Sequence, residues 1–99
     1  MPALHAEEAH AADLRLELAR HPQLGHVRVR RRGGALTLES GPEVDPVKHA
    51  RFRRVAAHLW ILEVASHTGR WQPSGLRGRL GELLQALIET FGWVLTPIA

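Results

Sequence analysis

The segment HVRVRRRGGALTLES, residues 26–40, constrains the fold more than any other part of the chain. Gly33-Gly34 matches a two-residue hairpin turn, because such turns need positive φ angles that glycine adopts readily. With these glycines as the turn, Arg32 faces Ala35, and the pairing continues outward to Arg28 opposite Glu39. One face then carries Val27, Val29, Leu36 and Leu38 with Arg31 at its rim, and the other carries Arg28, Arg30, Arg32, Thr37 and Glu39.

Residues 46–65 fit two alternatives. In the first they form a helix, because Asp45-Pro46 is typical of a helix start and Phe52, Val55, Leu59 and Leu62 have helical spacing. In the second, RFRRVA and LWILEVA are two strands, since Trp, Ile and Val favour strands. The second strand then places Trp60, Leu62 and Val64 on one side. Ala57-His58 is a poor turn for this hairpin, but we favour the strands, which supply the sheet that the first hairpin needs.

Two helices are expected to flank the hairpins. Residues 6–20 carry Ala11, Leu14 and Leu18 on one face, with Leu16 off that face. Residues 79–91 carry an unbroken apolar stripe of Leu80, Leu83, Leu84, Leu87, Ile88 and Phe91. We expect Gly92 to be a left-handed residue that ends this helix, Trp93 to pack back on Ile88, and WVLT to form a short final strand. The sequence therefore predicts one α+β domain over residues 1–99, a sandwich of one antiparallel sheet and two helices.

Composition excludes several kinds of site and suggests a compartment. The chain contains no cysteine, which excludes disulfides, thiolate-ligated zinc, iron–sulfur clusters and a thiol nucleophile. Its longest apolar run, Leu59–Leu62, is far shorter than the roughly 20 residues that span a bilayer. The first residues lack the basic-then-apolar order of a signal peptide. We therefore expect a cytoplasmic protein with no membrane association.

Twelve of the thirteen basic residues are arginine, whose guanidinium group binds phosphate with two parallel hydrogen bonds. GC-rich codon usage also produces arginine together with the thirteen alanines present, so the positions of the arginines are more informative than their number. Three clusters stand out: Arg28, Arg30 and Arg32; Arg51, Arg53 and Arg54; and Arg70, Arg77 and Arg79. If both hairpins join one sheet, the first two clusters form one basic patch, as expected of a protein that contacts nucleic acid.

The segment SHTGRWQPSG, residues 66–75, has two interpretations. In the first, His67, Thr68 and Arg70 gather at the start of the last helix, with Arg77 and Arg79 nearby, and bind an anion there. In the second, the glycines and Pro73 form a structural loop, and Trp71 fills the space between sheet and helix. We favour the second interpretation for Trp71, because tryptophan is usually buried for packing.

Other chemistry finds less support in the sequence. The seven histidines lack the spacing of metal ligands, and no glycine motif matches a nucleotide fingerprint, so we expect neither a metal nor a cofactor. We favour a non-catalytic module that contacts nucleic acid. One alternative is a homodimer or partner-protein module that uses a sheet edge or apolar surface around Trp60, Ile61 and Trp93. Another is a ribonuclease-like phosphodiesterase with His67 as acid or base and Arg70 holding phosphate.

Overall fold

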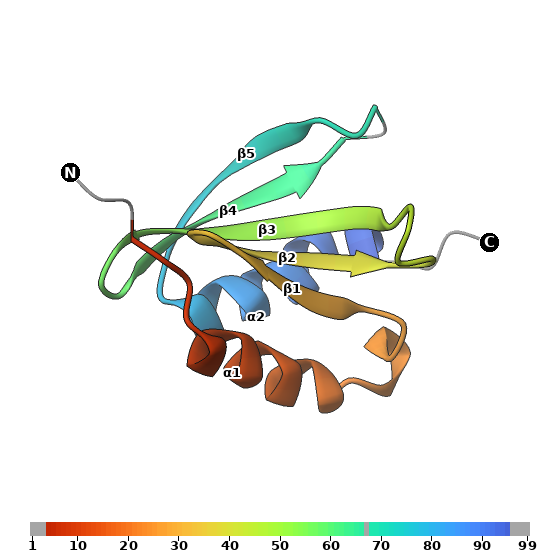
Figure 1. Ribbon diagram of the computed structural model, residues 1–99, viewed down its shortest axis with the longest axis horizontal. Helices are drawn as coiled ribbons and strands as arrows, with labels where there is room; N and C mark the ends of the chain where they lie inside the picture. The colour runs from red at the N-terminus through yellow and green to blue at the C-terminus, as the bar shows by residue number, and fades with distance from the viewer. Residues whose placement is uncertain (1–3, 67, 96–99) are drawn as a thin grey trace.

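A computed structural model describes residues 4–66 and 68–95 of the chain, with the side chains of 91, 93 and 94 outside that description. Two helices lie on one side of a five-stranded antiparallel sheet (Figure 1). The elements in chain order are α1 (Glu8–Ala19), η1 (Pro22–Leu24), β1 (Arg28–Arg32), β2 (Ala35–Ser40), β3 (Val47–Ala56), β4 (Leu59–Ala65), β5 (Trp71–Gly78), α2 (Leu80–Phe91) and η2 (Gly92–Leu95). The strands follow one another across the sheet in sequence order. The α+β prediction is therefore confirmed.

The β1–β2 hairpin has the register that the sequence predicts, from Arg32 opposite Ala35 to Arg28 opposite Glu39. The two turn glycines serve different purposes. Gly33 has φ +53°, a left-handed conformation that favours glycine. Gly34 does not have a positive φ, contrary to expectation; a Cβ there would lie 2.5 Å from the Leu4 carbonyl oxygen. The N-terminal segment therefore crosses close over this turn, held by a hydrogen bond from the Ala6 N–H to the Gly33 carbonyl.

Residues 47–65 form the strands β3 and β4, so the helical alternative is wrong and the strand alternative is confirmed. Phe52 pairs with Leu36 of β2 on one side and with Leu62 of β4 on the other, which forms an apolar row through the sheet centre. Arg54 stabilises the Ala57-His58 turn: its Nε and Nη2 atoms donate to the Ala57 carbonyl at 3.2 and 2.9 Å. A side chain thus compensates for a turn of unfavourable sequence.

The strand β5 is an element that the sequence pattern did not predict. Residues 71–75, which the sequence predicts as part of a loop, begin an edge strand that pairs with β4 from Ala65–Trp71 to Trp60–Gly78. Pro73 is compatible with this position because the outer edge of a last strand has no ladder partner. The pairing is irregular between Ile61 and Glu63, where the Ser74 hydroxyl donates to the Leu62 carbonyl at 2.7 Å. The glycines and proline therefore shape an irregular edge strand.

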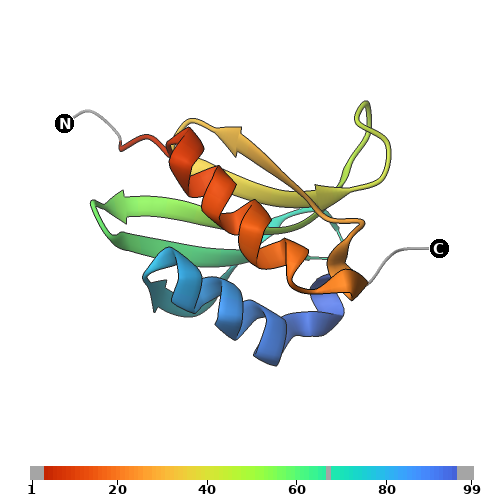
Figure 2. The ribbon, with the colours of Figure 1, turned by 90° about the horizontal axis from the view of Figure 1, so that it is seen from below.

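The core lies between the sheet and the two helices, which run side by side beneath it (Figure 2). From α1 it takes the predicted Ala11, Leu14 and Leu18; from α2 it takes Leu80, Leu83, Leu84 and Leu87, with Ile88 packed at its border. Leu16 is exposed, as its place off the stripe predicts. The predicted core faces of both helices are confirmed.

The chain after α2 differs from the prediction. Gly92 has φ −53° and belongs to the short helix η2, so it is not a left-handed terminator, and residues 93–95 form no strand. Leu95 is buried in the core, and its carbonyl lies 2.6 Å from the His26 Nε2 atom. Because helical turns continue to residue 95, Leu95 reaches the core. An extended segment would carry this residue away from the core. The predicted roles of the Phe91 and Trp93 side chains, and Thr96, lie outside the described residues.

Candidate nucleic-acid interface

The sheet face away from the helices, here called the open face, follows from the strand register (Figure 1). Three rows of paired residues cross it. The first is Arg32, Ala35, Arg53, Ile61 and Arg77; the second is Arg30, Thr37, Arg51, Glu63 and Pro73; the third is Arg28, Glu39 and Lys48, with Ala65 and Trp71 further along on β4 and β5. All five strands therefore contribute to one surface.

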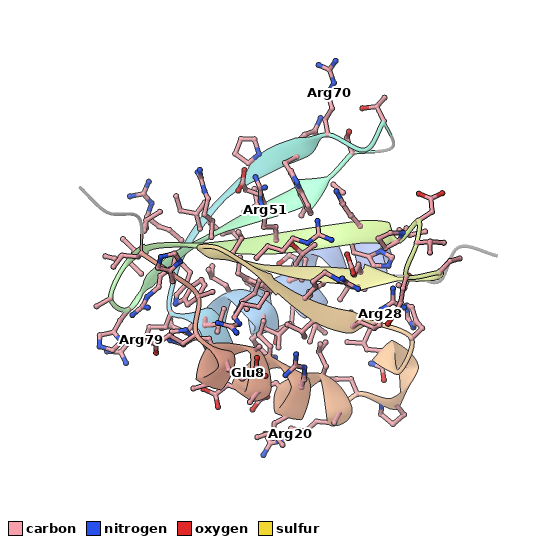
Figure 3. All side chains as sticks on the ribbon, in the orientation of Figure 1. Glu8, Arg20, Arg28, Arg51, Arg70 and Arg79 are labelled. Atoms are coloured by element: carbon pink, nitrogen blue, oxygen red, sulfur yellow. The ribbon has the colours of Figure 1, made fainter. Side chains whose placement is uncertain are left out.

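The open face is strongly basic. It carries six arginines and Lys48, against the two carboxylates Glu39 and Glu63. Figure 3 shows Arg51 over the middle of the sheet and Arg28 on the β1 side. The sheet thus brings Arg28, Arg30 and Arg32 of the first predicted cluster together with Arg51 and Arg53 of the second and Arg77 of the third.

Glu39 holds the β1 side of this face together. Its carboxylate is fully buried, and its Oε1 atom accepts a hydrogen bond from Arg30 Nε at 2.6 Å. Arg28, directly opposite on β1, donates instead to the Gly41 carbonyl, also at 2.6 Å. Because a buried carboxylate needs a charged partner, Glu39 restricts the Arg30 side chain to one place. Arg30 Nε is used in this contact, which leaves the outer edge of the guanidinium group without an ion pair to another described residue.

Glu63 has the corresponding role on the β4 side. Its Oε1 atom accepts hydrogen bonds from Arg51 Nε at 3.2 Å and Nη2 at 3.0 Å, and lies 3.5 Å from Arg53 Nε. The Arg51 guanidinium group also stacks on the Trp71 ring, 4.6 Å from its centroid. An arginine held by both a carboxylate and an aromatic face has little freedom. Arg51 is therefore a rigid cationic centre of the open face.

Three predicted site residues lie elsewhere. Arg54 reaches the opposite side, where its Nη1 atom donates to the His5 carbonyl at 2.8 Å. Arg79 is the residue before α2, and Arg70 lies at the far tip of the β4–β5 hairpin (Figure 3). Arg31 lies at the rim of the helix-covered face, as predicted, 3.6 Å from a Glu8 carboxylate oxygen. The arginine clusters are therefore only partly continuous in space.

The expected anion site in the segment 66–75 does not form at the start of α2. The eight-residue strand β5, roughly 25 Å long at the usual rise per residue, separates Thr68 and Arg70 from that helix. Ser66 instead organises the turn, since its hydroxyl accepts hydrogen bonds from the Thr68 and Arg70 N–H groups. His67 lies outside the described residues. Trp71 is half-buried on the open face, so its expected place between sheet and helix is also wrong.

Lys48 and Glu63 also belong to this surface, although the arginine clusters alone did not predict them. The signal for Glu63 was present, because it alternates with Leu62 and Val64 on β4. Lys48 was hidden by a bulge: β2 pairs Leu38 with Ala50 but the next residue, Glu39, with Lys48. A bulge changes which side of a strand a residue occupies, and simple alternation does not reveal it.

The apolar surface expected for a protein partner loses its central residue, because Trp60 is buried in the core. Ile61 is half-buried among the arginines of the open face, and the Trp93 side chain lies outside the described residues. Among the described residues, the exposed large apolar side chains are Leu4, Leu16, Val44 and Val55. They belong to different segments of the chain and give no argument for one apolar interface.

No protein-family model matches this chain, and neither the curated proteins nor the solved structures include a significant match. Among the described residues, no helix is long and apolar enough to cross a membrane, and no three side chains of His, Asp or Glu come together as metal ligands. The residues of the open face are therefore the feature from which a function can be inferred.

Proposed function

We propose that this protein binds nucleic acid through the phosphate backbone, using the open face of its sheet. The supporting observation is the concentration of six arginines and Lys48, against two carboxylates, on the one sheet face that the two helices leave uncovered. Backbone phosphates are the ligands that such a basic patch attracts in a nucleic-acid-binding protein. Arginine suits them because its guanidinium group can hold two phosphate oxygens at once.

The spacing of the arginines supports contact with several phosphates. Arg32, Arg53 and Arg77 lie in one row on alternate strands, about 10 Å apart if neighbouring strands are 4.7–4.9 Å apart. Along β1, Arg30 and Arg32 are about 6.5–7 Å apart, whereas the Nε and Nη2 atoms of Arg28 are buried and its Nη1 atom donates to the Gly41 carbonyl. A phosphate backbone that crosses the sheet along the first row would pass three arginines, Arg32, Arg53 and Arg77.

The two glutamates support the proposal as positioning residues. Glu39 orients Arg30, and Glu63 orients Arg51 and Arg53. Fixing these side chains before binding reduces the conformational entropy lost in the complex. Glu63→Gln has two opposite effects on nucleic-acid affinity. The loss of a negative charge should strengthen binding, whereas the release of the Arg51 side chain should weaken it. We expect the second effect to be larger, so that this variant binds nucleic acid more weakly than wild type.

The main experiment measures affinity for duplex DNA and for single-stranded RNA as a function of salt concentration. We choose Arg32, Arg53 and Arg77 for replacement by glutamine, because only Arg53 of these forms an ion pair with another described residue. Each lost contact should reduce the slope of log affinity against log salt by about 0.9 on duplex DNA and about 0.7 on a single strand. The triple change should therefore reduce it by roughly 2–3 units.

The matched control removes the same charge from the helix side, by replacing Arg15, Arg20 and Arg79 with glutamine. This variant should keep most of the wild-type salt slope. Equal losses in the two triple variants would show diffuse attraction without an interface and would refute the proposal. Absence of any nucleic-acid binding by the wild-type protein at low salt would refute the proposal as well.

The homodimer alternative is tested by measuring the molecular mass at micromolar protein concentration, because a dimer that covers the open face would compete with nucleic acid.

A further inference from the structure

A separate cavity of about 470 Å³ opens at the end of the molecule where α1, the β3–β4 turn and the start of α2 meet. Leu14 and Trp60, both buried, belong to its lining, together with Leu80 at the start of α2. Leu16, which is 69% exposed, lies at its rim. Its volume falls within the range of small-molecule sites, about 300–1,000 Å³. The cavity therefore offers an apolar floor to a ligand of modest size.

Opposite charges line two sides of this cavity. Asp13 and Glu17 project from one face of α1, since residues four apart are neighbours on a helix. Arg79 lines the cavity from the start of α2. Glu17 makes only a 3.7 Å contact with Arg20. Neither Asp13 nor Arg79 forms an ion pair or side-chain hydrogen bond within the described chain, so both are available to a ligand.

The wall beside these charges is organised by His10. Its Nδ1 atom accepts a hydrogen bond from the Glu7 N–H at 3.0 Å, as part of the capping of α1. The imidazole ring stands edge-on to the Trp60 ring, with centroids 5.0 Å apart. The hydrogen bond with Glu7 and the ring contact with Trp60 together hold the His10 side chain in place at this side of the cavity. On the opposite side Gly81 leaves open space at the first turn of α2.

We propose that this cavity binds a small zwitterion with an apolar body, namely a free apolar dipeptide. Asp13 and Glu17 would receive the ammonium group, and Arg79 the carboxylate, while Leu14, Trp60 and Leu80 contact the apolar side chains. An extended dipeptide separates its charged ends by up to about 7 Å, farther than a single amino acid does, and the two charged walls come from different elements, α1 and the start of α2. A ligand with one charge would leave the other wall unpaired.

The test is an NMR titration of the whole protein with leucyl-leucine, up to about 10 mM, a range that covers millimolar dissociation constants. We expect saturable shifts at the amides of Asp13 and Gly81 and at the Trp60 indole N–H. Asp13→Asn and Arg79→Gln should each weaken binding about ten-fold, as expected for the loss of one charged hydrogen bond. Glu43→Gln and Arg70→Gln, which change charge outside the cavity, are the matched controls and should leave the affinity for leucyl-leucine unchanged.

Two blocked peptides assign the charges to their walls. N-acetyl-leucyl-leucine lacks the ammonium group, so Asp13→Asn should no longer affect its binding. Leucyl-leucinamide lacks the carboxylate, so Arg79→Gln should no longer affect its binding. Lack of saturable binding by leucyl-leucine, or equal affinity in wild type and both cavity variants, would overturn the proposal. This result is independent of the nucleic-acid experiment, because none of the lining residues belongs to the open face.

Discussion

The two faces of strand β2 are both buried, but by different means. Leu36 and Leu38 point toward the helices and are completely buried, as the alternating pattern predicts. Thr37 and Glu39 point to the open face, yet they are only 6% and 0% exposed. On the first face, apolar side chains from the helices exclude water. On the second, no described helix is present, and the long side chains of neighbouring strands, Arg30 among them, surround the carboxylate.

This difference shows how an uncovered sheet face can be ordered without an apolar layer. Arginine side chains have long apolar stems that can lie over a sheet while the charged ends remain at the surface. Glu39 and Glu63 then fix those ends by ion pairs. The helix-covered face therefore supplies stability, and the open face supplies an arranged set of cations. The two tryptophans, and then neighbouring residues of β2, compare one face directly with the other.

The two tryptophans Trp60 and Trp71 should give the largest contrast. Trp60→Ala removes a buried core ring and should cost about 3–5 kcal/mol. Trp71→Ala removes a half-buried ring and its stacking with Arg51, which we expect to cost about 1 kcal/mol. Chemical denaturation of both variants measures the difference. Equal costs would show that the open face is as important for stability as the core.

Neighbouring residues of β2 give the second contrast. Leu38→Ala should cost about 2–5 kcal/mol, because it creates a cavity under the helices. Thr37→Val exchanges a hydroxyl for a methyl group of similar size, so it creates no cavity, and it should cost at most the net contribution of one hydrogen bond, about 0.5–1.5 kcal/mol. Urea denaturation at one pH compares the two. A larger cost for Thr37→Val would mean that the hydroxyl has an essential partner on the open face.

The buried ion pair gives the third contrast. Arg30→Ala leaves the Glu39 carboxylate buried without its partner, and we expect a cost of about 1–3 kcal/mol. The cost stays below the 3–5 kcal/mol of a fully buried pair, because the Arg30 side chain is 37% exposed and water can replace it. Adding Glu39→Gln should recover part of this loss. Arg32→Ala, on the same strand, has no ion pair within the described residues and serves as the control.

Local sequence patterns predicted the elements whose structure depends on neighbours close in the chain. The β1–β2 register followed from two glycines and strict alternation, and the core stripe of α2 followed from its period. Both kinds of pattern repeat over short distances. The β3–β4 hairpin was harder to predict, because its turn depends on Arg54, whose hydrogen bonds reach both Ala57 and the distant His5 carbonyl.

The remaining features depend on contacts between distant segments. Strand β5 contains Pro73 and two glycines, and its strand conformation depends on pairing with β4. The bulge that brings Lys48 to the open face depends on the pairing of β2 with β3. The arginine patch was predicted from the first two clusters, but Arg54 directly follows Arg53 in β3, so strand alternation places it on the opposite face. Local propensity does not determine such contacts, because tertiary packing overrides it.

The exposed carboxylate Glu8 offers the smallest contrast, against the buried Glu39. The hydrogen bond from Arg15, at 2.6 Å, lowers the pKa of Glu8 below its ordinary value of 4.5. A carboxyl group with a lowered pKa in the folded state stabilises that state above pH 4.5, and this contribution disappears as the pH falls through the folded pKa. Wild type should therefore exceed Glu8→Gln in stability by a small constant amount above pH 4.5, and the difference should shrink below it. Urea denaturation from neutral to acidic pH measures this difference in stability, with Glu43→Gln as an exposed control.

Because Glu8 is exposed, about 1 M salt should reduce the stability difference between wild type and Glu8→Gln, since the Debye length is then only about 3 Å. A difference between wild type and Glu8→Gln that grows on acidification, or that salt leaves unchanged, would contradict a screened surface ion pair.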